Sequence, residues 1–395
     1  MSRNLVSKCI LGCGLALAVL VPPGSAHAKG FSVLYSFTGS DGAHPTAGLI
    51  ADGAGNLYST TFEGGADGYG VVFKLAPNGT ETVLHSFADN GSDGYFPEAG
   101  LIKDKTGNLF GTTVRGGADN DGVVFKLAPN GTETVLYSFT GGSDGAEPDA
   151  GLIMDKKGNL YSTTYEGGSG DCTFNGTTGC GVVFKLAPDG TETVLHSFTG
   201  GSDGSVPVAG LIMDKKGNLY GTTSEGGGVR DAGVVFKLAP DGTETVLYSL
   251  CSQANCADGA NPSAGLIMDS SGDLYSTTTY GGADKAGVVF KLAPDGTETV
   301  LYSFNVVNGA YPTAGLIADG AGNLYGTTTS GGSDYYGVVF KLAPDGTETV
   351  LRSFETRSSG KYPQAGLIMD KKGNLYSTTT SGDADKDGGV FKLKE

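Results

Sequence analysis

Charged residues vary at two positions of a sequence that otherwise repeats itself closely. The residue before each copy of the tetrapeptide Ala-Gly-Leu-Ile is, in chain order, Thr46, Glu98, Asp149, Val208, Ser263, Thr313 and Gln364. The residue before the next glycine-rich stretch is Glu63, Arg115, Glu166, Glu225, Tyr280, Ser330 and Ser381. Two carboxyl groups beside an arginine can act as general acid and general base on a sugar, or can bind a metal ion. Glu98, Asp149 and Arg115 are therefore candidate catalytic residues, and the alternative is random variation among solvated loop tips.

A second pattern suggests a metal site near the end of the chain. Residues 383–388 read Asp-Ala-Asp-Lys-Asp-Gly, and alternate carboxylates followed by a glycine suit the oxygen-rich shell of a calcium ion. The glutamate usual at the twelfth position is missing, since residue 394 is lysine. Asp383, Asp385 and Asp387 are thus a candidate calcium site, with an acidic, soluble loop as the alternative. No other cofactor is expected.

Nucleophilic catalysis finds little support in the sequence. His85 and His196 occupy a position that is tyrosine in other repeats, which indicates a packing role. Only His44 has no counterpart, and no Gly-x-Ser-x-Gly motif accompanies it. The alternative is a lyase that uses His44 with Tyr311 or Tyr362.

The elements that must position these residues follow from internal repeats. Ala-Gly-Leu-Ile occurs seven times, beginning at Ala47, Ala99, Ala150, Ala209, Ala264, Ala314 and Ala365. Each unit contains four short apolar segments without helical periodicity, which we name strands a to d. In the third unit they are residues 150–155, 159–164, 182–186 and 193–198. Asp-x-x-Gly-Asn predicts a tight a–b turn, and Ala-Pro-Asp-Gly predicts a c–d hairpin.

Four antiparallel strands repeated about every 50 residues are typical of a β-propeller blade, with a solenoid as the rival architecture. Residues 31–37 form a strand d without a preceding strand c, and residues 389–393 form a strand c without a following strand d. Each terminus completes the other. We therefore expect an all-β, seven-bladed propeller closed by these two strands.

The two faces of such a ring differ in sequence. The a–b and c–d turns are nearly identical in every copy, whereas both insertions fall in b–c or d–a loops. We therefore expect a ligand to bind on the b–c/d–a face. The residues expected to line it are Glu63, Arg115, Glu166, Glu225, Tyr280, Tyr311 and Tyr362.

The chain as a whole has the features of an exported protein. Residues 1–28 resemble a secretory signal, with a basic start, a short apolar run and a small-x-small cleavage site, which leaves residues 29–395 as one domain. Two cysteine pairs, Cys172 with Cys180 and Cys251 with Cys256, predict local disulfides of a secreted or periplasmic protein. No later stretch is long enough to span a membrane.

Charge narrows the range of partners. The chain has 26 Lys and Arg against 42 Asp and Glu, a formal net charge of −16, which argues against nucleic acid or an anionic membrane. With 38% hydrophobic and 17% charged residues, a packed core is expected and disorder is not. We expect a monomer.

The repeated unit AGLIxDxxGNLYGTTxxGG…GVVFKLxPDG resembles the GloVer (Gloeobacter/Verrucomicrobia) tandem repeat of exported bacterial proteins over residues 31–394. The resemblance implies a repeat-bearing surface or secreted bacterial protein and no established activity. We expect a non-enzymatic binding or scaffold propeller whose acidic, loop-rich face binds a protein, a glycan or a cation. The alternatives are an extracellular polysaccharide hydrolase or lyase with carboxylates at the channel mouth, and a purely structural envelope protein.

Overall fold

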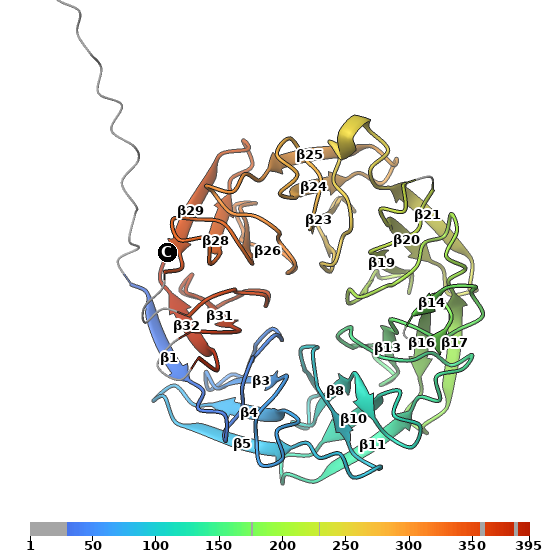
Figure 1. Ribbon diagram of the computed structural model, residues 1–395, viewed down its shortest axis with the longest axis vertical. Coiled ribbons are helices and arrows are strands. Elements are labelled where there is room, and N and C mark those ends of the chain that lie inside the picture. The colour runs from blue at the N-terminus through green and yellow to red at the C-terminus, as the bar shows by residue number, and fades with distance from the viewer. Residues whose placement is uncertain (1–29, 175–176, 229, 356–359, 383–385) are drawn as a thin grey trace, which may run out of the picture.

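Seven four-stranded antiparallel sheets form a ring around a central channel (Figure 1). The computed structural model describes residues 30–174, 177–228, 230–355, 360–382 and 386–395. The predicted signal segment therefore lies outside the described residues. The sequence-based expectation of a seven-bladed β-propeller is confirmed.

The strands run from the channel outward in the order a, b, c, d. Blade 1 contains β2 (Ile50–Ala51), β3 (Leu57–Thr61), β4 (Val71–Leu75) and β5 (Glu81–Ser86), and blade 2 contains β7 (Ile102–Lys103), β8 (Leu109–Thr113), β10 (Val123–Leu127) and β11 (Glu133–Ser138). Blade 3 contains β12 (Ile153–Met154), β13 (Leu160–Thr163), β16 (Val182–Leu186) and β17 (Glu192–Ser197), and blade 4 contains β18 (Ile212–Met213), β19 (Leu219–Thr223), β20 (Val234–Leu238) and β21 (Glu244–Ser249). Blade 5 contains β22 (Ile267–Met268), β23 (Leu274–Thr278), β24 (Val288–Leu292) and β25 (Glu298–Ser303), and blade 6 contains β26 (Ile317–Ala318), β27 (Leu324–Thr328), β28 (Val338–Leu342) and β29 (Glu348–Ser353).

Blade 7 joins the two ends of the chain. It contains β30 (Ile368–Met369), β31 (Leu375–Thr379), β32 (Gly389–Leu393) and, as its outermost strand, β1 (Ser32–Ser36). Ser32 pairs with Lys392 and Ser36 pairs with Gly389, so the predicted closure is confirmed. Figure 1 shows β1 beside β32.

Both repeated turns have the predicted structure. In the a–b turn of blade 3, Asp155 accepts hydrogen bonds from the backbone N–H groups of Lys157 and Asn159 and from the Asn159 side chain. In the c–d hairpin, Gly190 has a φ of 86° and donates its N–H to the carbonyl of Ala187. Only a residue that tolerates positive φ fits there, as the sequence indicates.

Strand a is shorter than the six residues predicted, because a threonine hydroxyl of the preceding blade, and not a backbone N–H of strand b, bonds to the carbonyl at its start. In each blade only two residues of strand a pair with strand b. The first threonine of the Thr-Thr pair in strand b donates instead to the carbonyl of the Ala-Gly-Leu-Ile alanine in the next blade, as Thr222 does to Ala264 at 3.3 Å. The same bond occurs at all seven seams, including Thr378 to Ala47 where the ring closes.

The core lies in the seams between blades. The phenylalanine at the end of strand d packs edge-on against the strand c phenylalanine of the next blade, with ring centroids 5.0 to 5.3 Å apart in six seams. These rings are almost wholly buried. Leu250 replaces the strand d phenylalanine at the remaining seam. Each blade therefore buries its apolar side chains only against its neighbours, which makes the closed ring the stable unit.

A partly buried glutamate recurs at the outer rim of the seams. Strand d of six blades begins with a glutamate whose Oε1 is buried without a hydrogen-bond partner among the described residues, namely Glu81, Glu133, Glu192, Glu244, Glu298 and Glu348. Burial raises the pKa of each to about 7, and in five of them an aspartate in the loop before that blade adds to the shift. At the closing seam, Phe31 takes the glutamate position and the Arg352 guanidinium lies 4.4 Å from its ring centroid.

Both predicted disulfides are present, and both close loops on the b–c/d–a face. Cys172–Cys180 holds the blade 3 insertion, which contains the short pair β14 (Thr173–Phe174) and β15 (Thr177–Thr178). Cys251–Cys256 closes the loop after β21, which contains a 3₁₀ turn, η1 (Ala254–Cys256). Within the part of the chain that the structure describes, no helix has the length and apolar character needed to cross a bilayer.

Candidate functional site

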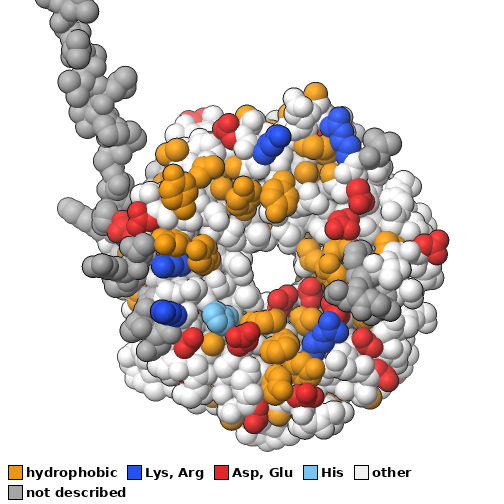
Figure 2. Space-filling model, viewed as in Figure 1, with side chains coloured by type: hydrophobic (Ala, Val, Ile, Leu, Met, Phe, Trp, Pro, Cys, Tyr) orange, Lys and Arg blue, Asp and Glu red, His pale blue; other side chains and the backbone are white. Residues whose placement is uncertain are grey.

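The b–c and d–a loops form one face of the ring, as predicted. In each blade the b–c residue that precedes the glycine-rich stretch pairs through its backbone with a residue of the d–a loop, for example Glu166 with Ala146 and Tyr280 with Ala260. Figure 2 shows this face: carboxylates and a cation gather at one side of the channel with apolar side chains beside them, and a further group of large apolar side chains lies across the channel. The variable residues of the sequence therefore project from a rigid backbone.

The acidic side of this face brings together the predicted catalytic candidates of blades 2 and 3. Glu98 is exposed in the channel mouth, whereas Asp149 is half-buried and its Oδ1 has no hydrogen-bond partner among the described residues. Arg115 forms an ion pair with Glu147, a buried residue that the sequence analysis did not single out. We call Glu98, Arg115, Glu147 and Asp149 the acidic cluster.

Burial and mutual repulsion disfavour full ionisation of the acidic cluster. Although Glu98 is exposed to the channel, protein atoms around its carboxyl group remove part of its hydration, and this desolvation, followed by the charge of Glu147, raises the pKa of Glu98. Burial, with the charges of Glu98 and Glu147, raises the pKa of Asp149 well above its ordinary value, and Arg115 opposes this shift. Two interacting carboxyl groups of this kind share protons, so one can donate a hydrogen bond while another accepts one. Such a pair can bind sugar hydroxyls or act as acid and base.

A collar of seven residues surrounds the face and was not anticipated from the sequence. It consists of the residue before the proline that precedes each Ala-Gly-Leu-Ile motif, which is His44, Phe96, Glu147, Val206, Asn261, Tyr311 or Tyr362, each with φ between 52° and 58°. A residue before proline normally favours extended backbone, so this conformation is strained. The signal was the recurring Xaa-Pro dipeptide, but its left-handed backbone could not be read from sequence.

Two backbone hydrogen bonds hold each collar residue. Its N–H donates to a carbonyl in the b–c loop of the preceding blade at 2.8 to 3.0 Å, and its carbonyl accepts an N–H from its own b–c loop at 2.9 to 3.3 Å. Tyr311, for example, bonds to Ala286 and Thr329. The collar therefore presents seven side chains of six kinds on one repeated, strained backbone, a feature associated with functional sites.

Exposed tyrosines occupy the side of the face across from the acidic cluster. Six of the seven large apolar side chains that are exposed among the described residues lie in loops of blades 5 to 7, namely Tyr280, Val306, Val307, Tyr311, Tyr335 and Tyr362. Tyr280 and Tyr311 contact edge-on with centroids 5.5 Å apart, and Tyr336 and Tyr362 do the same. Tyr335 has 65% of its surface exposed. Exposed aromatic rings gathered on one side of a face mark a binding surface more often than a solvated one.

The repeat profile described as the Gloeobacter/Verrucomicrobia repeat matches residues 24–175 and 170–391. The chain belongs to this family. No curated protein matches it in sequence. Among solved structures, it resembles the extracellular domain of a proposed one-component system from B. thetaiotaomicron, with 11% identity and a TM-score of 0.58 over 93% of this chain and 40% of that one.

A proposed 6-phosphogluconolactonase from Bacteroides uniformis is also similar to this Gloeobacter/Verrucomicrobia repeat protein. Its identity is 17% and its TM-score 0.52, over 82% of this chain and 88% of that one. The chain thus spans well under half of the first structure and most of the second. At such identities both likenesses show the propeller fold alone.

Of the remaining predicted residues of this repeat protein, Glu166 is fully buried and its charge adds to the raised pKa of Asp149, so it lies with the acidic cluster and not on the exposed face. His44 and Glu63 lie together in another blade. His44 Nδ1 is 2.9 Å from the carbonyl of Thr380, and Nε2 is 3.7 Å from Glu63. The bond to the carbonyl favours protonation of Nδ1 and leaves Nε2 directed at the carboxylate. His85 contacts Asp93 and His196 contacts Asp203 in the seams, which agrees with the packing role predicted for these two residues.

The predicted calcium site is tested only in part. Asp383 and Asp385 lie outside the described residues, and Asp387 is half-buried. Within the described ranges, no group of three or more Asp, Glu, His or Cys side chains is arranged to hold a metal ion. The calcium site therefore stays a prediction from sequence.

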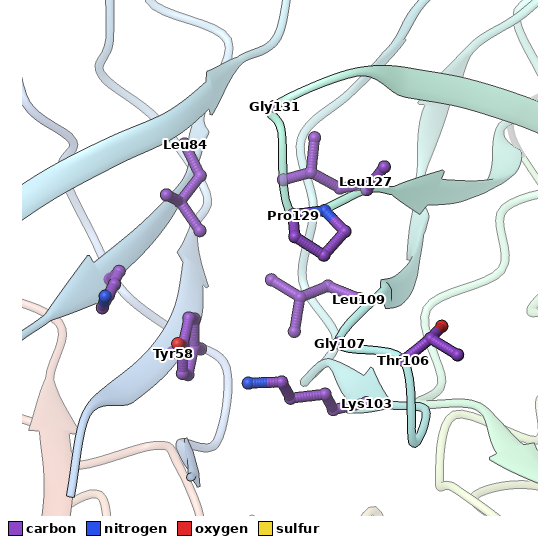
Figure 3. A pocket seen from close by; sticks show the side chains of 11 residues that line it. Tyr58, Leu84, Lys103, Thr106, Gly107, Leu109, Leu127, Pro129 and Gly131 are labelled. Carbon is purple, nitrogen blue, oxygen red and sulfur yellow. The ribbon is translucent and has the colours of Figure 1, made fainter. Parts of the chain in front are cut away.

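The opposite face carries a groove at the seam of blades 1 and 2, with a volume of about 330 Å³ (Figure 3). Tyr58 and Leu84 come from blade 1, and the Lys103 ammonium group lies 4.4 Å from the Tyr58 ring centroid. Equivalent grooves lie at three other seams, between the same turns of neighbouring blades. This cavity follows from the repeat and is not a distinct site.

Proposed function

We propose that this protein is an exported binding propeller that takes a glycan on its b–c/d–a face. The observation that carries the proposal is the group of exposed tyrosines in blades 5 to 7. A tyrosine ring offers an apolar surface to the face of a sugar and a hydroxyl to its edge. The acidic cluster supplies carboxyl donors and carboxylate acceptors for sugar hydroxyls across the channel mouth.

The proposal assumes that the protein is exported to an oxidising compartment. The two disulfides agree with an oxidising environment. The segment of residues 1–28 has the composition of a secretory signal. A glycan is preferred over a protein partner because the exposed rings alternate with polar loops, and no single flat apolar surface joins them. An anionic nucleic acid is disfavoured by the net charge of −16.

The test is the binding of soluble oligosaccharides, measured by isothermal titration calorimetry with the purified protein. Tyr335→Ala and Tyr311→Ala should each weaken binding about tenfold, because each removes an exposed ring from the sugar-binding surface. Tyr220→Ala is the matched control, since its hydroxyl bonds to Asp214 at an a–b turn on the other face. Equal loss from the control, or no loss from the two test variants, would contradict the proposal.

A polysaccharide hydrolase or lyase is the second candidate, favoured by the coupled carboxyl groups of Glu98 and Asp149. In that case the group with the higher pKa would donate a proton to the leaving oxygen, and the other would act as base or nucleophile. Glu98→Gln and Asp149→Asn should then abolish cleavage of a polysaccharide while oligosaccharide binding persists. Unchanged cleavage in both variants excludes them as acid and base.

A further inference from the structure

A pocket of about 460 Å³ opens on the b–c/d–a face where blades 4 and 5 meet. It is lined by Arg230, Asn255, Cys256, Ala260, Tyr280, Gly281 and Lys285. Its size falls within the range of about 300 to 1,000 Å³ usual for small-ligand sites. No carboxylate lies among these lining residues, although the chain carries 42 acidic residues against 26 basic ones. The pocket is therefore locally cationic on an acidic protein.

Arg230 is anchored through one of its guanidinium nitrogens. Nη1 donates to the carbonyl of Gln253 at 2.7 Å and to that of Cys251 at 3.1 Å. For Nε and Nη2 the structure records no bond to a described residue, so this edge of the guanidinium is available to a ligand. A planar pair of N–H donors matches the two oxygens of a carboxylate. The carbonyls that hold Arg230 belong to the loop closed by Cys251–Cys256.

Lys285 supplies the second cation of the pocket. Its side chain is exposed, and within the described ranges it forms no ion pair. Its backbone has a φ of 59°, and the neighbouring disulfide loop contains Cys251, Asn255 and Cys256 with φ of 55°, 57° and 54°. Left-handed backbone at four non-glycine residues around one pocket indicates that the surrounding structure holds these side chains in place at a cost in strain.

The Tyr280 ring forms an apolar wall of the pocket, a flat surface on which a sugar ring can stack. Its side chain is 51% exposed, and its backbone exchanges two hydrogen bonds with Ala260 at 2.9 and 3.0 Å. Tyr311 supports the ring edge-on. Asn255, at the tip of the disulfide loop, carries an exposed amide that can donate to and accept from hydroxyl groups. The pocket thus combines a ring platform, an amide and two cations.

We propose that this pocket is a subsite for a sugar residue that carries a carboxylate, that is, a uronic acid. The proposal rests on the proposed glycan-binding function and specifies its ligand class. The sugar ring stacks on Tyr280, its carboxylate accepts from Arg230 and Lys285, and its hydroxyls reach Asn255. Because the protein is acidic overall, it repels polyanions. The expected ligand is therefore a glycan with isolated or terminal uronic acid residues.

The test is calorimetric titration of the purified protein with glucuronate and, separately, with glucose. Glucuronate should bind at least about tenfold more tightly than glucose, since a charged hydrogen-bonded pair is worth about that factor. Arg230→Gln should remove this preference and leave glucose binding unchanged. Arg230→Lys should restore only part of it, because a lysine lacks the planar fork. Lys371→Gln, which removes one charge from an a–b turn, should change nothing.

Other outcomes would overturn the assignment in distinguishable ways. Equal affinity for glucuronate and glucose, both weakened by Tyr335→Ala, would refute the uronate subsite and leave the glycan-binding proposal standing. Affinity for acetate equal to that for glucuronate would refute a sugar subsite. Tighter binding of glucose 6-sulfate than of glucuronate would refute the assignment to a carboxylate and favour a sulfated sugar. Failure to bind any oligosaccharide of the panel, neutral or acidic, would refute the proposed function itself.

Discussion

Raising the pH from 5 to 8 should destabilise this propeller, because six seam glutamates must release protons that only the folded state retains. Each has a pKa of about 7 in the folded chain, against an ordinary value of 4.5. Between these values the folded state binds more protons than the unfolded state, so stability falls as the pH rises through this window. Above pH 7 the loss is complete.

The magnitude follows from the shift and from solvent screening. A shift of 2.5 units corresponds to about 3.4 kcal/mol per site, and because these side chains are half-exposed we reduce this to about 1 kcal/mol each. Six seams then lose about 6 kcal/mol between pH 4.5 and 7. The a–b turn aspartates act in the opposite sense, since hydrogen bonds hold the pKa of Asp52, Asp319 and Asp370 at about 2. They stabilise the fold above pH 4 and cease to do so in stronger acid, so maximum stability is expected between about pH 4 and 4.5.

Thermal unfolding followed by circular dichroism at pH 5 and pH 8 measures this effect, and Glu192→Gln isolates one seam. The amide removes the charge and nearly keeps the shape, so the variant should gain about 1 kcal/mol at pH 8, or about 2 °C in the unfolding midpoint, and almost nothing at pH 5. Asp67→Asn, at an exposed loop position, is the control and should respond equally at both pH values. A midpoint that stays constant or rises from pH 5 to pH 8 would refute the reasoning.

Three further changes test how the ring is held together. Thr60→Val should cost about 1 to 2 kcal/mol by removing the hydroxyl that bonds to the carbonyl of Ala99 at 3.2 Å, while Thr60→Ser keeps the hydroxyl and should cost less, as read from urea unfolding. Phe31→Ala should cost about 3 to 5 kcal/mol of unfolding free energy, since it removes a ring from the closing seam together with its contact to Arg352. Urea unfolding measures this loss as well. A loss below about 1 kcal/mol would show that closure does not depend on this contact. Reduction of the Cys251–Cys256 disulfide should weaken uronate binding about tenfold in calorimetry while the far-ultraviolet dichroism stays unchanged, because that loop anchors Arg230.

The architecture was predictable because the repeat supplies several samples of each local rule. The a–b aspartate and the Thr-Thr pair recur at fixed offsets in seven blades and the c–d glycine in six, so a role inferred in one blade could be checked against the others. Closure was predictable from the two incomplete ends. The length of strand a was not, since the sequence does not show that a hydroxyl of the preceding blade, such as that of Thr222, bonds to its alanine carbonyl.

The site was predictable only where residues depart from the repeat. Glu98, Asp149 and Arg115 were found by that criterion, and the structure places them in one cluster. Glu147, which forms the ion pair with Arg115, was missed because a residue before proline is expected to be extended. Two neighbouring backbone hydrogen bonds override that local preference in every blade. Arg230 was missed for another reason, since it follows the glycine-rich stretch and lies outside the two positions that were compared across the repeats.

The sevenfold backbone constrains how this protein can recognise a ligand. Each blade presents its collar residue with nearly the same φ and the same two backbone bonds, so the backbone itself cannot distinguish one blade from another. Selectivity must therefore come from the side chains, and these are unequally distributed: carboxyl groups on blades 1 to 4, tyrosines on blades 5 to 7, and two cations where these regions meet. A symmetric ligand would gain no affinity from this unequal distribution. A glycan whose successive residues differ in charge would gain affinity, because each residue could lie over a blade of matching chemistry.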